Sequence, residues 1–236
     1  MYHSVSPDRD DPYQITVRPE RLDRQLRWLR WLGRRGVSVT ELIEARRQGR
    51  GQRLVGLTFD DGYADFVDYA LPALNRYHFT ATVFVLAGRL GGDNAWNANG
   101  PRKPLMTPEQ VRQVAAAGME IGSHGLRHVS LPSVSDEELA AELRQSRHIL
   151  QEITGQNVGG FCYPYGHLDA RVVSGVQAAH YDYACAIWPA EFTGQHAIRR
   201  TYIRDADSPP RLRAKDLWSS VKARAGRRLP GAGTGR

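Results

Sequence analysis

Short apolar runs alternate with amphipathic segments along this 236-residue chain, and that alternation limits the folds it can adopt. The runs that predict buried strands are 37–39, 54–59, 80–86, 119–122, 158–163 and 181–187. The segments that predict helices by their apolar spacing are 19–35, 40–48, 63–77, 107–118, 135–154 and 168–180. Strands that alternate with helices predict a mostly parallel sheet, and this many units favour closure into a barrel.

Two local features interrupt the alternation. Pro72 lies inside the helical segment 63–77 and is expected to kink or break that helix. Residues 88–107 are rich in Gly, Asn and Pro and predict a long loop. Loops of that length in compact domains are often functional.

Acidic and imidazole side chains follow two of the predicted strands. Asp60 and Asp61 come directly after one strand, and His124 and His128 come after another. In a parallel barrel the reactive side chains gather at the carboxyl ends of the strands. Two histidines and one carboxylate form the ligand set of a catalytic zinc site with an open position for water. A second carboxylate beside the first supplies a base for that water.

Each of these pairs has a simpler explanation when it is taken alone. An Asp-Asp-Gly sequence after a strand is commonly only a turn, and lone histidines at this spacing are more often surface or capping residues. Joint occurrence at the strand ends of one barrel favours a site over both explanations. His124 and His128, four residues apart, share a face if the chain turns helical there.

Three short motifs appear in order along the chain. They are residues 58–62 (Thr-Phe-Asp-Asp-Gly), 123–128 (Ser-His-Gly-Leu-Arg-His) and 161–166 (Phe-Cys-Tyr-Pro-Tyr-Gly). Together they resemble the polysaccharide deacetylase family, carbohydrate esterase family 4, and the resemblance runs from Tyr2 to about Ile203. It implies an α/β fold, a distorted (β/α) barrel of about seven parallel strands.

The resemblance also implies an activity, the metal-dependent removal of an acetyl group from an N-acetylated sugar. It assigns Asp61, His124 and His128 to the metal and Asp60 to the general base. Amide hydrolysis near neutral pH needs a water acidified by a Lewis acid and a nearby group that accepts its proton. Zinc is the expected ion for two imidazoles and one carboxylate, and cobalt, nickel and manganese suit similar ligands.

The general acid departs from the family's usual arrangement, in which it is a late histidine. The late segment 197–203 holds no suitable histidine, and His196 comes just before it. The opening Tyr2-His3 is similar to a circularly permuted subgroup typified by poly-N-acetylglucosamine deacetylases, which carry this histidine near the N-terminus. The resemblance therefore assigns His3 as the acid, and the alternative is a frayed terminal residue.

The third motif also departs from the family. Many members have Arg where this chain has Cys162, and that Arg helps to hold the catalytic base; Arg199 or Arg200 is the expected replacement. The backbone N–H of Tyr165 is expected to help hold the oxyanion. The alternative for this segment is an ordinary Pro-Gly turn.

Two tryptophans are candidates for substrate binding. Trp188 follows the strand 181–187 and is a candidate for the acetyl-methyl pocket, with a plain core position as the alternative. Trp96 in the long loop is a candidate for stacking on a sugar ring, with simple loop packing as the alternative.

Bulk properties restrict the partners. The net charge of +7 comes from arginine, since lysine occurs only at positions 103, 215 and 222. The arginines are scattered over predicted helix faces and the C-terminal tail, without the alternating aromatics of an RNA-binding surface, so we expect no nucleic-acid partner. The expected partner is a carbohydrate substrate, and no protein partner is inferable.

The sequence also predicts the state of the cysteines, the cellular compartment and the domain bounds. The two cysteines are too few for a disulfide framework and are expected to be buried thiols. No apolar run approaches the roughly 20 residues that a membrane helix needs. Without a signal peptide we expect a cytoplasmic protein as the sequence is given, or an extracellular or periplasmic one if an N-terminal segment is missing. Residues 1–225 are the expected catalytic domain, and 226–236 the expected disordered tail.

One alternative from another functional class stays open. A catalytically weak carbohydrate-binding paralogue would keep the same pocket, and Cys162, the displaced acid and the abrupt start favour it somewhat. The acetylated sugar itself cannot be read from the loops.

Overall fold

A computed structural model describes residues 1–187, 192, 194–208 and 210–215 of the chain. The chain divides into two compact units, Met1–Asp205 and Ala206–Arg236. In the second unit residues 210–215 are helical, and the predicted tail lies outside the described residues. Within the described part, no helix is both long and apolar enough to cross a membrane.

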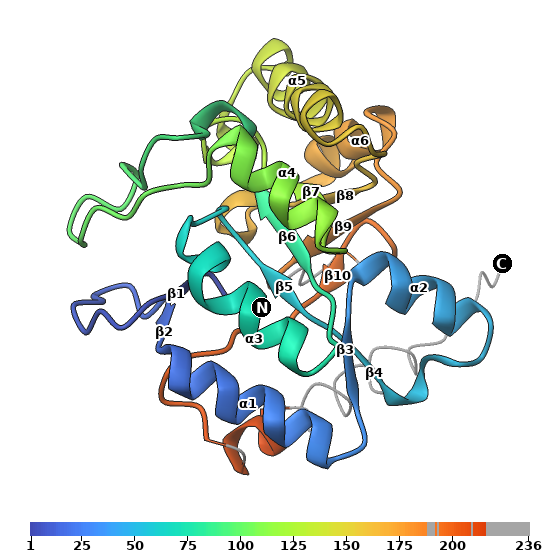
Figure 1. Ribbon diagram of the computed structural model, residues 1–236. Helices are drawn as coiled ribbons and strands as arrows, with labels where there is room; N and C mark the ends of the chain where they lie inside the picture. Colours follow the sequence, from blue (N-terminus) through green and yellow to red (C-terminus); the bar gives the residue numbers. More distant parts are fainter. Residues whose placement is uncertain (188–191, 193, 209, 216–236) are drawn as a thin grey trace, which may run out of the picture. The chain divides into compact units, whose positions relative to one another are not determined.

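The first unit is built on a six-stranded, all-parallel sheet in the order β10-β9-β8-β7-β6-β5 (Figure 1). In chain order its strands are β5 (Thr58–Phe59), β6 (Thr82–Val85), β7 (Glu120–Ser123), β8 (Gly160–Cys162), β9 (Tyr183–Ala186) and β10 (Ile198–Arg199). The first five are buried throughout, apart from Glu120, as the apolar runs predict.

The N-terminal residues close this sheet into a ring. Tyr2 forms a parallel bridge with Phe59, and its N–H donates to Thr58 O at 2.8 Å. On the other side, the amino group of Met1 donates to Thr201 O at 2.6 Å. The N–H of Ile203 donates back to Met1 O at 3.0 Å. Met1 and Tyr2 therefore fill the gap between β5 and the residues that follow β10, which agrees with a barrel of about seven parallel strands.

Two short parallel pairs lie outside this ring. They are β1 (Ser4–Val5) with β2 (Thr16–Val17), and β3 (Arg35–Val37) with β4 (Leu54–Gly56).

The predicted single strand over 54–59 is wrong in one respect, because it is divided between two sheets at Leu57. The N–H of Leu57 donates to Val37 O, and its carbonyl accepts from the Thr82 N–H, each at 2.9 Å. The chain thus changes strand partners at this residue, from β3 to β6. Apolar residues lie on both sides of Leu57 within 54–59, so the sequence pattern does not show that the segment belongs to two sheets.

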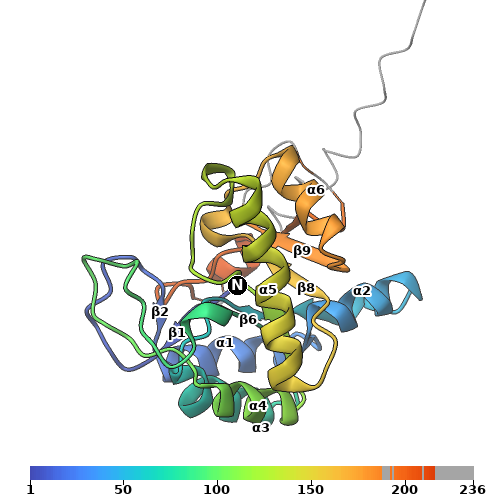
Figure 2. The same cartoon turned by 90° about the horizontal axis from the view of Figure 1, so that it is seen from above.

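Helices follow the strands and cover the outside of the sheet (Figures 1 and 2). They are α1 (Pro19–Trp31), α2 (Val39–Arg47), α3 (Leu71–Arg76), α4 (Pro108–Ala116), α5 (Asp136–Thr154) and α6 (Ala170–Ala178). Short 3-10 or π turns occupy Gly51–Arg53, Phe66–Ala70, Ala87–Arg89, Leu131–Ser133 and Pro164–Gly166. The predicted kink or break at Pro72 takes the form of a π turn that runs into α3 with helical backbone at the junction, and Pro72 lies in the first turn of α3.

Aromatic side chains fill the space between the sheet and the helices. Phe59, Phe66 and Phe161 are each no more than 1% exposed and belong to one core cluster. Cys162 and Cys185 are buried free thiols, as the sequence predicts.

Closure by the N-terminal residues should contribute strongly to stability. The ring of Tyr2 is 4% exposed and stacks on Phe59 with centroids 5.1 Å apart. Tyr2→Ala should therefore lower the free energy of unfolding by about 3 kcal/mol, because it leaves a cavity at the seam of the barrel. Trp31→Ala, at a ring that is 79% exposed, is the control and should change little. Urea unfolding measures both, and equal effects would contradict a seam at Tyr2.

Candidate metal centre and active site

Buried polar side chains gather at the carboxyl ends of the strands of the six-stranded sheet. Asp60 directly follows β5, His124 follows β7 and Arg200 follows β10. Asp60, Asp61 and His124 are only 3%, 4% and 3% exposed. Because parallel strands end at the same edge of the sheet, the fold brings together groups from distant parts of the sequence.

A left-handed turn makes two adjacent carboxylates face the same mouth. Successive side chains on a strand point to opposite faces, but Asp61 has φ of +73° and Gly62 has φ of +74°. This turn redirects the chain immediately after Asp60. Asp tolerates the left-handed region better than most residues, whereas a Cβ at Gly62 would meet Val85 Cγ1 at 3.3 Å as well.

Three buried ligand atoms, from Asp61, His124 and His128, lie within 4.8 Å of one another. The Nε2 atoms of His124 and His128 are 3.2 and 3.4 Å from Asp61 Oδ1. Ligands about 2.1 Å from a tetrahedral ion are separated by about 3.4 Å, so these distances match the edges of a zinc-type site. Asp61 Oδ1 is buried and has no well-formed hydrogen bond to any residue that the structure describes. The three residues therefore fit a divalent metal ion.

A second group of possible ligand atoms, from Asp60, His124 and Cys162, is equally compact. Two of its members are already engaged, since Asp60 pairs with Arg200 and Cys162 Sγ accepts from Arg200 Nη2 at 2.9 Å. The Asp61 group is therefore the better candidate for a metal.

The two histidines converge through a loop, and the helical turn considered for them is not formed. Residues 124–130 have no helical or strand structure, and His128 has φ of +62°. Glu142 of α5, which is fully buried, holds this loop. Its carboxylate accepts from the Leu126 N–H at 2.6 Å and from Arg127 Nε at 2.8 Å. The sequence offered one signal for Glu142, an acidic residue on the apolar face of the 135–154 helix.

The imidazole rings are oriented in two different ways. His124 Nδ1 donates to Cys162 O at 2.8 Å, which turns its Nε2 toward Asp61. His128 is held by aromatic packing. The ring of Trp96 stacks on it with centroids 4.7 Å apart, and Tyr165 meets it edge-on at 4.3 Å. Burial lowers the pKa of His128, although Asp61 opposes this effect. The lowered pKa favours the neutral imidazole that a metal requires.

These contacts place Trp96 and Tyr165, both predicted to contact the substrate, next to His128. Trp96 packs against His128 and a small cluster with Leu86 and Leu105, so its ring is part of the loop's own packing. Tyr165 has φ of +59° and is 47% exposed at the rim of the site. Sugar stacking by Trp96 and oxyanion binding by the Tyr165 N–H stay predictions, and Trp188 lies outside the described residues.

Asp60 is held as a carboxylate by Arg200. The guanidinium donates to both carboxylate oxygens, at 2.6 and 2.7 Å, and also to Thr58 Oγ1 at 2.9 Å. Burial by itself would raise the pKa of Asp60, but Arg200 outweighs it and lowers the pKa to about 2. Of the two arginines considered as replacements for the missing family Arg, Arg200 is the one beside Asp60, and it also contacts Cys162.

His3 lies next to Asp60 because of the strand register. Tyr2 pairs with Phe59 and both rings point into the core, so His3 and Asp60 face the opposite side, toward the mouth of the barrel. Burial lowers the pKa of His3, and Asp61 and Asp60 oppose that decrease. Its Nδ1 is buried and has no hydrogen-bond partner among the described residues.

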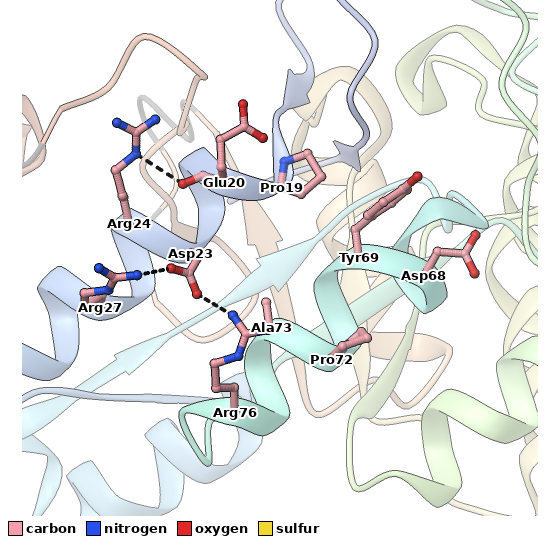
Figure 3. Close-up of a pocket in the computed structure, with 10 residues that line it drawn as sticks. All are labelled: Pro19, Glu20, Asp23, Arg24, Arg27, Asp68, Tyr69, Pro72, Ala73 and Arg76. Carbon is pink, nitrogen blue, oxygen red and sulfur yellow. Dashed lines mark hydrogen bonds and ion pairs between the residues drawn. The ribbon is translucent and has the colours of Figure 1, made fainter.

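A separate hollow of about 560 Å³ lies between α1 and residues 68–76, which belong to the π turn and to α3 (Figure 3). Its walls carry both signs of charge, and Asp23 pairs with Arg27 of its own helix and with Arg76 on the opposite wall. None of the described residues predicted for the site lines it. The chemistry therefore belongs to the mouth of the barrel.

Comparison with known proteins decides the family. A sequence profile described as "Polysaccharide deacetylase" matches residues 47–184. The chain belongs to the polysaccharide deacetylase family. The matched range includes Asp60, Asp61, His124 and His128, whereas His3 and Arg200 lie outside it.

Individual relatives are distant. The chain is 24% identical over 208 residues to YxkH of Bacillus subtilis strain 168, an alignment that covers 86% of this chain and 70% of that protein. It is 26% identical over 161 residues to the poly-beta-1,6-N-acetyl-D-glucosamine N-deacetylase of Staphylococcus epidermidis, over 64% of this chain and 54% of that enzyme. The chain thus spans about half the length of the staphylococcal enzyme.

A solved structure supports the fold. Streptococcus pyogenes deacetylase PplD in complex with acetate superposes with a TM-score of 0.77 at 23% identity, over 91% of this chain and 95% of that chain. This likeness confirms the predicted parallel (β/α) barrel, and the sequence profile confirms the predicted family, whose members are polysaccharide deacetylases.

The pairing of Arg200 with Asp60 should be critical for stability. Arg200→Met would leave Asp60 buried and uncompensated, so we expect the free energy of unfolding to fall by about 3 kcal/mol or more. Asp60→Asn in the same chain should restore part of that loss. Arg112→Met is the control, because its pair with Glu109 is exposed and such pairs contribute little. Urea unfolding of the metal-free unaltered protein and of these three variants measures the effects, and an Arg200→Met effect no larger than that of the control would contradict the pairing.

Proposed function

We propose that this protein is a metal-dependent carbohydrate N-deacetylase. The single observation that carries the proposal is the convergence of Asp61, His124 and His128 beside a second carboxylate, Asp60, that is held ionised. Family membership restricts the reaction to removal of an acetyl group. The supported substrate is an N-acetylated sugar of a polysaccharide, oligosaccharide or glycoconjugate.

Asp61, His124 and His128 would hold the metal, and zinc suits two imidazoles and one carboxylate best. A bound divalent ion supplies a water of lowered pKa and polarises the acetamide carbonyl. Asp60 accepts the proton of the attacking water. Its two hydrogen bonds to Arg200 keep it ionised and fix its direction, but they also weaken it as a base.

The leaving amine needs a proton, and His3 would supply it. Burial lowers the pKa of His3 and so makes its imidazolium the stronger acid, while Asp61 and Asp60 retain part of the protonated population. The Tyr165 N–H would stabilise the oxyanion, because Tyr165 has a left-handed backbone and its ring contacts His128 at the rim of the site.

The proposed substrate class rests on the relatives. The staphylococcal relative is a poly-beta-1,6-N-acetyl-D-glucosamine N-deacetylase, so beta-linked N-acetylglucosamine oligomers are the first substrates to test. The indole of Trp96, which is half-buried and stacked on His128, would contribute to sugar binding.

Acetate release from N-acetylglucosamine oligomers tests the activity. The zinc-loaded protein should release acetate, a chelator should stop it, and added zinc should restore it. Asp60→Asn should lower the rate by about 100-fold or more while zinc stays bound. Asp61→Ala should lose the zinc itself, as metal analysis would show. Asp68→Asn, at an exposed carboxylate of the next turn, should leave the rate unchanged.

A substrate pair with different leaving groups tests the acid. His3→Ala should slow acetate release from an acetamide by about 100-fold, because the amine cannot leave unprotonated. It should affect an aryl acetate far less, because a phenolate leaves without a proton. Equal losses on both substrates would remove His3 from the role of acid.

A further inference from the structure

A buried lysine lies beside the N-terminal strand. Lys103, in the long loop between β6 and α4, is only 6% exposed. Its ammonium donates to Ser4 Oγ at 2.9 Å and to Ser6 Oγ at 3.4 Å, and it pairs with Asp8 at 3.2 Å. A buried ammonium is costly unless acceptors surround it. All of these acceptors belong to the segment that begins directly after His3.

A carboxylate holds the same strand from the other side. Asp65 follows the turn at Asp61 by four residues, and its Oδ1 accepts from the Val5 N–H at 3.0 Å. Its Oδ2 accepts from the Ser4 hydroxyl. The buried Ser4 hydroxyl thus donates to Asp65 while it accepts from Lys103, so one side chain joins a cation to an anion. Desolvation raises the pKa of Asp65 to about 6, which leaves it largely ionised at neutral pH.

The loop that carries Lys103 is itself anchored. The Lys103 N–H donates to Asn94 Oδ1 at 2.8 Å, which closes the loop on itself. The returning limb then pairs with the turn after Asp61, through Ala64 N–H to Pro104 O at 3.0 Å and Met106 N–H to Gly62 O at 2.8 Å. The tip of this loop contacts the loop that joins β1 to β2, where the Asn99 N–H donates to the Tyr13 hydroxyl at 3.1 Å (Figure 2).

These contacts complete the support of His3. Tyr2, just before it, is paired with β5, but the chain leaves that strand after His3. Ser4 and Val5, just after it, pair with β2 through their backbone, and their remaining polar groups are held by Lys103 and Asp65. The imidazole therefore lies between two fixed points of the backbone, and Lys103 contributes to the second, through the Ser4 side chain.

We propose that Lys103 is a positioning residue which, through Ser4, holds His3 in place to protonate the leaving amine. The inference rests on the proposed deacetylase function and on His3 as its acid. Lys103 acts on the backbone and does not touch the substrate. A misplacement of the acid by about 1 Å is enough to slow such a reaction by about 100-fold.

Lys103→Met tests this role with the two substrates described above. It removes the ammonium and keeps most of the buried stem. We expect kcat for acetate release from N-acetylglucosamine oligomers to fall about 10- to 100-fold, with KM little changed. Hydrolysis of an aryl acetate should change less than about threefold, because its leaving group needs no proton. Zinc affinity should be unchanged, because no metal ligand is moved.

Three further variants make the result specific. Ser4→Ala should give the same selective loss, and the Ser4→Ala/Lys103→Met double variant should be little worse than either single one, because both act through one contact. Lys103→Arg should recover part of the acetamide rate. Arg102→Met is the matched control, since it removes the neighbouring cation, which is 54% exposed on its side chain, and should leave both rates unchanged.

Each outcome decides the proposal. If Lys103→Met slows both substrates equally, or slows neither, Lys103 has no positioning role. His3 would still be the acid in that case, provided that His3→Ala loses only the acetamide reaction. If the unaltered protein releases no acetate, or His3→Ala is fully active on the acetamide, the proposed function itself fails and this inference fails with it. If Lys103→Met does not fold, Ser4→Ala and Lys103→Gln decide the question in the same assay.

Discussion

The backbone pairing of Tyr2 with β5 is the constraint on which the rest of the site depends. It closes the barrel between β5 and the residues after β10, and it also sets which side chains face the mouth. Because strand side chains alternate, a slip of one residue would turn His3 into the core and Tyr2 into the site. Stability and catalytic geometry therefore depend on the same few hydrogen bonds.

The second constraint is charge. Asp60 and Asp61 are adjacent, almost fully buried and both acidic, so each needs its own compensation. Arg200 neutralises Asp60 through a bidentate pair, which leaves Asp61 to the two histidines and a metal. This division gives chemically identical side chains different roles, and the left-handed turn at Asp61 makes it possible. Left-handed backbone recurs at His128 and Tyr165, as is common where a site is preorganised.

The sequence predicts much of this structure, because local patterns carry much of the information. Buried strands, amphipathic helices and the polar residues at strand ends are all local patterns, and the predicted elements agree with the structure to within a few residues. The parts that failed depend on distant partners. The division of 54–59 at Leu57 requires knowledge of both β3 and β6. The loop at 124–128 is shaped by Glu142, which comes from a helix further along the chain.

The charged residues that support the site show the same limit. Arg199 and Arg200 are equivalent in sequence, and only the register with β9 turns Arg200 inward. Lys103 resembles any solvated loop lysine until its contacts with Ser4 and Asp8 are known. Burial distinguishes such residues from ordinary surface residues, and a single sequence does not show which charged side chains are buried.

The position of the metal tests the central claim most directly. An anomalous-scattering map of crystals soaked in zinc should show one ion about 2.0–2.2 Å from an Asp61 oxygen and from the imidazole nitrogens of His124 and His128, with Asp60 left on Arg200. An ion bound instead by Asp60, His124 and Cys162, or none at the mouth of the barrel, would contradict the proposed site.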